Sequence, residues 1–308
     1  MPRIAIVQDQ PGATLAEGIE VTRARTIAAA RDGAELVVFP ETWLPGYPVW
    51  LDVCRDVALW DHGPVKAVHA RVVANAVSVP GAATESLGAI ARDTAVVLVV
   101  GVVERVDAGP GRGTLYNAVL TFGADGTLLN HHRKLVPTYT ERLVWGPGDA
   151  HGLHAVDTPI GRVGALVCWE HWMPLARQAM HESGEDVHVA LWPTAHEQLQ
   201  LASRAYAFEG RCYVLAAGAL LRASALPPEL EPHPDIVKSP DQWVMRGGSA
   251  VIGPDGRYII EPVYDEPRVL VANLDLARLH GERMALDVAG HYSRPDVLRL
   301  DVVRVRRN

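Results

Sequence analysis

Apolar residues fall in short runs along this chain, and segments with helical spacing separate the runs. The first run covers residues 3–8 and the second covers residues 35–41, while apolar and small residues recur at helical intervals over 14–31. Gly33 follows the helical segment and supplies a stop signal. This alternation is typical of an α/β protein whose strands are buried on both faces.

Two Asp-Gly pairs add a second pattern to this alternation. Strand-like runs flank the pair at 125–126 and again the pair at 255–256, which predicts two β-hairpins. Between the hairpins, strand-like and helical segments alternate once more. The remaining predicted helices cover residues 64–79, 84–93 and 197–210. The remaining predicted strands cover residues 95–104, 161–170, 187–193 and 213–218.

The chain is therefore predicted to form mixed sheets covered by helices. We expect one continuous domain over residues 1–308, with a short tail from about residue 299. Residues 223–240 are rich in proline and polar side chains. We interpret them as a long surface loop within the domain, because the strand pattern after them resembles the pattern before them.

Composition and charge narrow the classes of function. The 308 residues are 48% hydrophobic and 21% charged, with a net charge of −7, so nothing favours a nucleic-acid or acidic membrane partner. The longest apolar run, residues 95–103, is far shorter than the ~20 residues that cross a bilayer. The N-terminus enters a strand-like run without a leader, and three cysteines leave no paired framework. We therefore expect a cytoplasmic protein.

Metal and nucleotide sites find little support in the sequence. The segments "HESGE" and "HEQLQ" lack a second histidine at the spacing that places two imidazoles on one helical face, and no Cys-x-x-Cys pair exists. The glycines of "GPGRGT" lack the Lys-Ser/Thr of a phosphate loop. We expect neither a metal nor an organic cofactor.

Cys168 is the thiol with the most informative surroundings. It ends an apolar strand, and Met173-Pro174 indicate a helix that starts close behind it. A helix N-terminus lowers the pKa of a nearby thiol and favours the thiolate. These local features leave a nucleophile and a buried strand-end cysteine equally open. Cys54 and Cys212 fit better as packing residues.

A thiol nucleophile needs a base and a group that stabilises negative charge. Glu41 is a candidate base, since it ends the run "ELVVFPE" before an aromatic segment that would desolvate it and raise its pKa. Lys134 follows another strand, in "NHHRKLVPTYTER". Its spacing does not decide between a site lysine and a solvated basic cluster with Arg133.

Three segments together resemble the nitrilase superfamily of carbon–nitrogen hydrolases. They are "VVFPETWLPGYP", "HRKLVPTYTERLVWGPGD" and "GALVCWEHWMPL", in the family's order of Glu, Lys and Cys. The "GHYSRPDVL" of residues 290–298 is also similar to the end of the nitrilase branch. The resemblance extends from Arg3 to about Leu298, which is nearly the whole chain.

The resemblance implies a four-layer α-β-β-α sandwich and assigns roles to four residues. Cys168 would be the nucleophile, Glu41 the general base, and Lys134 the cation facing the tetrahedral intermediate. Glu141 matches a second glutamate that holds the lysine and assists proton transfer. Six residues are expected to form the substrate pocket, at the nucleophile, after the next strand and in the Glu41 loop: Trp169, Trp172, Trp192, Pro193, His196 and Tyr47.

The "CWE" segment resembles nitrilases proper, which implies hydrolysis of an organic nitrile to the acid and ammonia through a thioimidate and a thioester. A cyanide-hydrolysing enzyme, an amidase or a carbamoylase with the same three groups remains an alternative. A non-catalytic binding protein is a third, which the intact Glu41, Lys134 and Cys168 disfavour. The resemblance also implies a homo-oligomer, while the short tail argues against long filaments.

Overall fold

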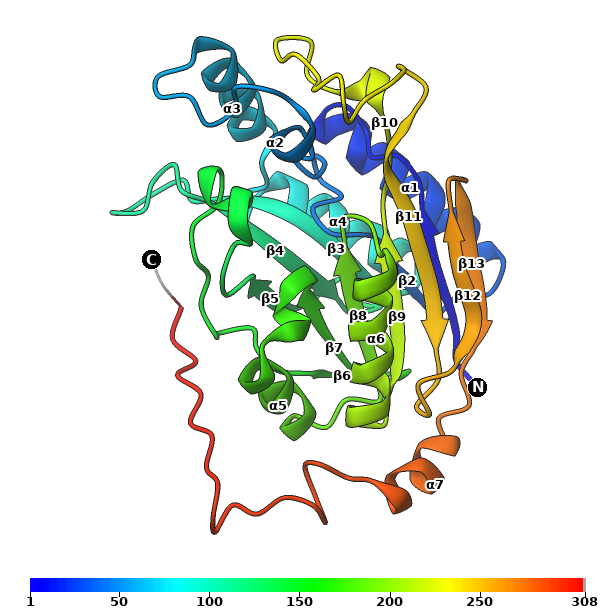
Figure 1. Ribbon diagram of the computed structural model, residues 1–308. Coiled ribbons are helices and arrows are strands. Elements are labelled where there is room, and N and C mark those ends of the chain that lie inside the picture. Colours follow the sequence, from blue (N-terminus) through cyan, green and yellow to red (C-terminus); the bar gives the residue numbers. More distant parts are fainter. Residues whose placement is uncertain (307–308) are drawn as a thin grey trace.

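The apolar runs of the sequence become the strands of two facing sheets in the computed structural model, which describes residues 1–306 (Figure 1). The first sheet joins the N-terminal strand to the strands of the first hairpin. Its order is β13 (Arg268–Asn273), β1 (Arg3–Gln8), β2 (Leu36–Val38), β3 (Val97–Arg105), β4 (Leu115–Phe122) and β5 (Leu128–Arg133). Strands β1, β2 and β3 are parallel to one another, and the others pair antiparallel.

The second sheet is mixed in the same way. Its order is β10 (Leu220–Arg222), β11 (Trp243–Ile252), β9 (Tyr213–Gly218), β8 (Val187–Trp192), β7 (Gly161–Val167) and β6 (Val156–Thr158), with β12 (Tyr258–Tyr264) paired to β11. Both predicted hairpins are present, as β4–β5 and β11–β12. Apolar side chains from the facing sheets form one core cluster, in which Ile4 and Ile6 join Val163 and Val189.

Helices cover the outer faces of both sheets and complete the α-β-β-α sandwich that the resemblance implied. On the first sheet lie α1 (Leu15–Arg31) and α4 (Ala82–Thr94), and on the second α5 (Pro174–Glu182) and α6 (Glu197–Gly210) (Figure 1). The remaining helices are α2 (Trp50–Val53), α3 (Gly63–Asn75) and α7 (Arg278–Ala285). Thr14 caps α1, because its hydroxyl accepts a hydrogen bond from the Glu17 N–H at 3.3 Å.

The structure differs from the sequence predictions at several segments. The strand predicted over 35–41 ends at Val38, and the helix predicted over 64–79 ends at Asn75. The loop 223–240 is partly buried, because Leu226 and Leu230 join an apolar cluster with α2. Proline prevents regular structure there without excluding apolar packing.

The predicted C-terminal tail lies along the protein as far as it is described. The Arg306 guanidinium donates to the carbonyl of His131 at 2.6 Å and to Asp149 at 3.2 Å. Residues 307 and 308 lie outside the described part of the chain. None of the helices within residues 1–306 is long and apolar enough to cross a membrane.

Candidate active site

The segment after β2 carries Glu41 into the space between the sheets, where the residue is only 1% exposed. A close backbone approach makes this possible. A Cβ at Gly101 of β3 would collide with the carbonyl oxygen of Pro40 and lie 2.5 Å from the nitrogen of Thr42. Glycine at position 101 therefore lets the Glu41 segment pack directly on β3.

Lys134 follows β5 and is buried beside Glu41. Its backbone N–H donates to the carbonyl of Asn117 at 2.7 Å, which extends the β4–β5 pairing by one residue. Its Nζ lies 3.2 Å from Glu41 Oε1 and 2.7 Å from Glu141 Oε2. Arg133 points elsewhere and donates to Glu104. The alternative of a solvated basic cluster is therefore wrong.

One oxygen of Glu41 is bound and the other is free. Oε1 accepts from Asn117 Nδ2 at 2.6 Å and from Lys134, whereas Oε2 accepts no hydrogen bond from the described residues. Burial raises the pKa of Glu41 to about 7 against the opposing attraction of Lys134. The Oε2 atom can therefore take up and return a proton near neutral pH.

Glu141 stands in the short 3-10 helix η1 (Tyr139–Leu143) on the other side of the lysine. Its carboxylate accepts from the Tyr47 hydroxyl at 2.9 Å and from the Thr138 backbone N–H at 2.7 Å, in addition to Lys134. Burial and then the carboxylate of Glu141 raise the pKa of Tyr47, so its hydroxyl remains a donor. Glu141 is thereby fixed as the anchor of the lysine.

Cys168 lies at the turn between β7 and the 3-10 helix η2 (Cys168–Trp172), with a left-handed φ of 55°. The thiol is 3% exposed, and its Sγ and one oxygen each of Glu41 and Glu141 all lie within 4.8 Å of one another. A non-glycine residue held at positive φ stores backbone strain, a feature that clusters at functional sites. The structure thus brings the predicted nucleophile within 4.8 Å of the predicted base, which in turn contacts Lys134.

The pKa of the Cys168 thiol differs from the sequence prediction. Burial and then the charge of Glu41 raise this pKa well above its usual value, although Lys134 and the backbone N–H of Trp169 act in the opposite direction. The helix predicted from Met173-Pro174 does form, as α5 from Pro174, but the 3-10 helix η2 separates its N-terminus from Cys168, and a helix dipole acts mainly within its first turn. The thiol is protonated at rest and needs a base.

The same carboxylates and thiol form a group that could hold a metal ion, namely Glu41, Glu141 and Cys168. The Nζ of Lys134 already lies within hydrogen-bond distance of both carboxylates. Burial opposes the charge of this lysine, but Cys168, Glu41 and Glu141 together raise its pKa above the usual value. A fixed ammonium ion therefore supplies the positive charge that this donor set attracts.

A cavity of about 360 Å³ opens beside the thiol. Four of the six predicted pocket residues line it: Tyr47, Trp169, Pro193 and His196. Trp192 does not, because it is fully buried and its Nε1 donates to Ser203 Oγ at 3.1 Å. Trp172 also lies outside the lining and is 36% exposed. Trp192 is the last residue of β8 and its side chain is turned into the core, whereas Trp172 is the last residue of the 3-10 helix η2 and lies at the surface.

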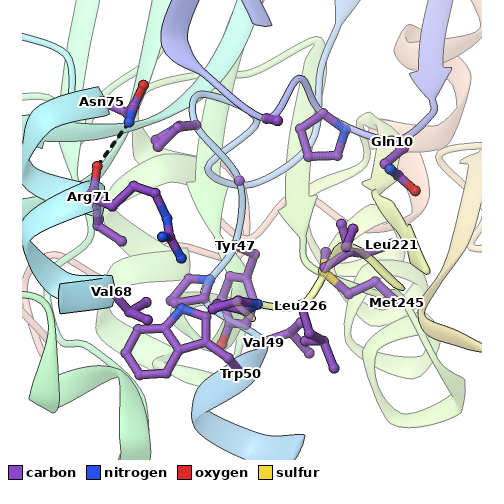
Figure 2. A pocket seen from close by; sticks show the side chains of 18 of the residues that line it. Gln10, Tyr47, Val49, Trp50, Val68, Arg71, Asn75, Leu221, Leu226 and Met245 are labelled. Carbon is purple, nitrogen blue, oxygen red and sulfur yellow. Dashed lines mark hydrogen bonds between the residues drawn. The ribbon is translucent and has the colours of Figure 1, made fainter. Parts of the chain in front are cut away.

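A second cavity of about 360 Å³ adjoins the first (Figure 2). Tyr47, Val49 and Met245 line both cavities and so form the wall between them. Trp50 of α2 also lines the second cavity. Figure 2 shows Arg71 on the same side of this cavity as Val68.

Sequence reasoning misses Asn117, which holds Glu41. The only signal for it is a polar side chain at a buried position inside the apolar strand "LYNAVLTF". Glu170 of η2 is a second buried polar residue that supports the site. It accepts from the backbone N–H groups of Leu135 and Val167 at 2.8 Å each, and so ties the lysine strand to the nucleophile turn.

A buried thiol beside a free carboxylate oxygen and a fixed lysine, between the sheets of an α-β-β-α sandwich, defines a class of hydrolase. The carbon–nitrogen hydrolase family pattern matches residues 3–283, and the chain belongs to this family. Among its relatives, an aliphatic nitrilase from Sinorhizobium fredii is 39% identical over 308 residues, covering 97% of this chain and 95% of that protein. "Nitrilase 2" from an unknown prokaryotic organism is 40% identical, covering 91% and 85%.

Other relatives extend this comparison. A bifunctional nitrilase/nitrile hydratase from Lupinus angustifolius is 38% identical, over 89% of this chain and 78% of that protein. Among solved structures, a carbon–nitrogen hydrolase from Helicobacter pylori G27 superimposes with a TM-score of 0.69 at 19% identity, covering 96% of both chains. An amidase from Nesterenkonia sp. AN1 gives a TM-score of 0.65 at 20% identity, covering 92% and 97%. These structures confirm the predicted fold.

Proposed function

We propose that this protein is a nitrilase, which hydrolyses an organic nitrile to the carboxylic acid and ammonia. The observation that carries the proposal is the buried carboxylate of Glu41, a base with a pKa of about 7 whose Oε2 accepts no hydrogen bond and of which one oxygen lies within 4.8 Å of the sulfur of Cys168. The relatives of 36–40% identity that carry the name nitrilase support the nitrile as substrate.

The first half of the reaction forms a thioimidate. The sulfur of Cys168 attacks the nitrile carbon while its proton passes to Glu41 Oε2 and then to the nitrile nitrogen. Lys134 and the backbone N–H of Trp169 face the charge that develops on this nitrogen. The product is a neutral C=N–H group bonded to carbon and sulfur, and Glu41 is again a carboxylate.

The second half consumes two water molecules. The first adds to the thioimidate carbon with Glu41 as base, and protonation of the nitrogen lets ammonia leave as a thioester remains. The second water attacks the thioester and releases the carboxylic acid, while the thiol of Cys168 recovers its proton. The balance is one nitrile and two waters to one acid and one ammonia.

The test is a product analysis over aliphatic, aromatic and arylacetic nitriles, with acid, amide and ammonia quantified separately. We expect acid and ammonia in equal amounts from at least one nitrile. Turnover of cyanide alone, or of amides alone, would contradict the proposal in favour of the alternative enzymes of the same family. Accumulated amide measures how often the tetrahedral intermediate expels the thiol instead of ammonia.

We also propose that the protein is cytoplasmic and forms a homo-oligomer. All three cysteines are free, which fits a reducing compartment. Helices α5 and α6 lie on the outer face of the second sheet (Figure 1), and η2 contacts both of them. These three elements carry large apolar side chains that are exposed. They are Trp172, Leu175, Leu201 and Phe208, each at least 36% exposed. A second copy of the chain would bury them.

Replacing Leu201 with glutamate is expected to convert the oligomer into a smaller species, because the charge would be buried in the interface. Size-exclusion chromatography with light scattering measures this change. The matched control is Leu59→Glu, at a leucine of similar exposure (56% against 59%) outside α5 and α6. Equal masses for the two variants and the wild type would contradict this interface.

A further inference from the structure

A buried chain of hydrogen bonds runs behind the nucleophile. The carbonyl oxygen of Cys168 lies 2.7 Å from His171 Nδ1, and His171 Nε2 lies 2.9 Å from His188 Nε2. His188 Nδ1 lies 2.6 Å from Glu185 Oε1, and the Tyr206 hydroxyl donates to Glu185 Oε2 at 2.5 Å. None of the mechanism's steps uses these groups, and all of them are at most 3% exposed.

The carbonyl acceptor at one end of this hydrogen-bonded series determines which nitrogen of each histidine carries a proton. A carbonyl oxygen can only accept, so His171 Nδ1 carries a hydrogen. Burial and then His188 lower the pKa of His171 to about 3, so this ring is neutral and its Nε2 accepts. His188 Nε2 must then donate. The contact between His188 Nδ1 and Glu185 Oε1 therefore needs one shared proton on either atom.

Loss of this shared proton disrupts the hydrogen bond between His171 and His188. With Glu185 ionised and His188 neutral, the one remaining proton of His188 turns towards the carboxylate. The two Nε2 atoms would then face each other as acceptors, unless His171 moved its proton away from the carbonyl of Cys168. Burial raises the pKa of Glu185 to about 7, so this change falls near neutral pH.

The carboxyl group of Glu185, at the far end of the hydrogen-bonded series, is tightly packed against β7. A Cβ at Gly164 of β7, four residues before the nucleophile, would collide with Glu185 Oε1. Glu185 also borders a separate cavity of about 270 Å³ that Arg211 and Arg283 line, so protons can reach it without passing the substrate. Trp192 and Tyr206 enclose His171, with ring centroids 4.7 and 5.6 Å away.

We propose that Glu185, His188 and His171 form a proton-dependent positioning relay, which holds the left-handed backbone of Cys168 and thereby aligns its sulfur with Glu41. The inference rests on Cys168 being the nucleophile of the proposed function. Charged and titratable groups face the relay from the surrounding elements. They are His181 and Arg177 of α5, Glu170 of η2, Glu209 of α6, Cys212, Asp186 and Arg283.

The experiment compares the pH dependence of kcat/KM in the full-length wild type and two variants. In Glu185→Gln the amide nitrogen donates to His188 and the amide oxygen accepts from Tyr206, so the pattern persists without a titrating proton. We expect this variant to match the wild type near pH 6 and to lose the decline that the wild type shows above about pH 7. The acid limb due to Glu41 is common to both.

Glu185→Leu removes the donor and is expected to lower kcat about tenfold or more at every pH, with a smaller change in KM, because the sulfur is misaligned. Thermal unfolding checks that the variant folds, and if it does not, the glutamine comparison decides alone. An alkaline limb in Glu185→Gln that is identical to that of the wild type would overturn the proposal.

A second measurement does not depend on the substrate. The rate at which iodoacetamide alkylates Cys168, followed by mass spectrometry, is expected to show the alkaline break in the wild type and not in Glu185→Gln. A wild type that hydrolyses no nitrile but shows this difference would refute the proposed function and keep the relay. Equal alkylation profiles together with normal nitrile turnover would refute the relay alone.

Discussion

Replacement of Cys168 with alanine is expected to abolish nitrile hydrolysis, with a loss of about 10⁴-fold or more in kcat. The reaction proceeds through a bond between this sulfur and the nitrile carbon, and no other described side chain places a thiol beside Glu41. Ammonia release measures the loss. Mass spectrometry of the intact protein is expected to find an acyl adduct in the wild type and none in the variant.

The chain offers two matched controls for this substitution. Cys54 and Cys212 are buried thiols outside the site, and burial raises the pKa of both. Their alanine variants are expected to keep kcat and to lose about 1–3 kcal/mol of unfolding free energy through the cavities they leave. Turnover by Cys168→Ala at the level of either control would refute the assigned nucleophile.

Replacement of Lys134 with methionine is expected to reduce both stability and activity. The lysine is the cation between two buried carboxylates, and removal of one partner from a buried pair costs about 3–5 kcal/mol. The pKa of Glu41 then rises above about 7, because the attraction that lowered it is gone. Since the base must be ionised, the acid limb of kcat/KM moves to higher pH.

A double variant separates charge from catalysis. Lys134→Met combined with Glu141→Gln removes one positive and one negative charge, so most of the lost stability is expected to return while kcat stays low. Urea unfolding and pH–rate profiles measure the two effects. A single variant with wild-type stability and an unmoved acid limb would show that Lys134 does not pair with Glu41 in solution.

Much of the site could be predicted from sequence because its three motifs end apolar runs. A polar residue that ends an apolar run is expected at the end of a strand, where several strand ends lie close together. The resemblance then assigned Glu41, Lys134 and Cys168 to one site, although 127 positions separate the first from the last. The pocket aromatics were harder. Trp192 is the last residue of β8 and its side chain points into the core, a direction that depends on the exact strand register.

The remaining differences concern contacts between distant segments. The pKa of Cys168 depends on burial by both sheets and on Glu41, which no local helix signal reports. Asn117 and His188 lie inside apolar strands, and their partners lie 76 and 17 positions away. A buried polar residue in a strand indicates that a hydrogen-bond partner exists, but the sequence does not show which residue the partner is.

Because the site lies between the two sheets, catalytic activity requires that the sheets are packed against each other. Glu41 and Lys134 follow strands β2 and β5 of the first sheet, and Cys168 follows β7 of the second. Each sheet could keep its hydrogen-bonded ladders while the two separate, and such a chain would hold every reacting group but no reaction centre. Catalytic turnover in this protein is therefore a direct report on the docking of the two sheets, which brings together groups that lie far apart in the sequence.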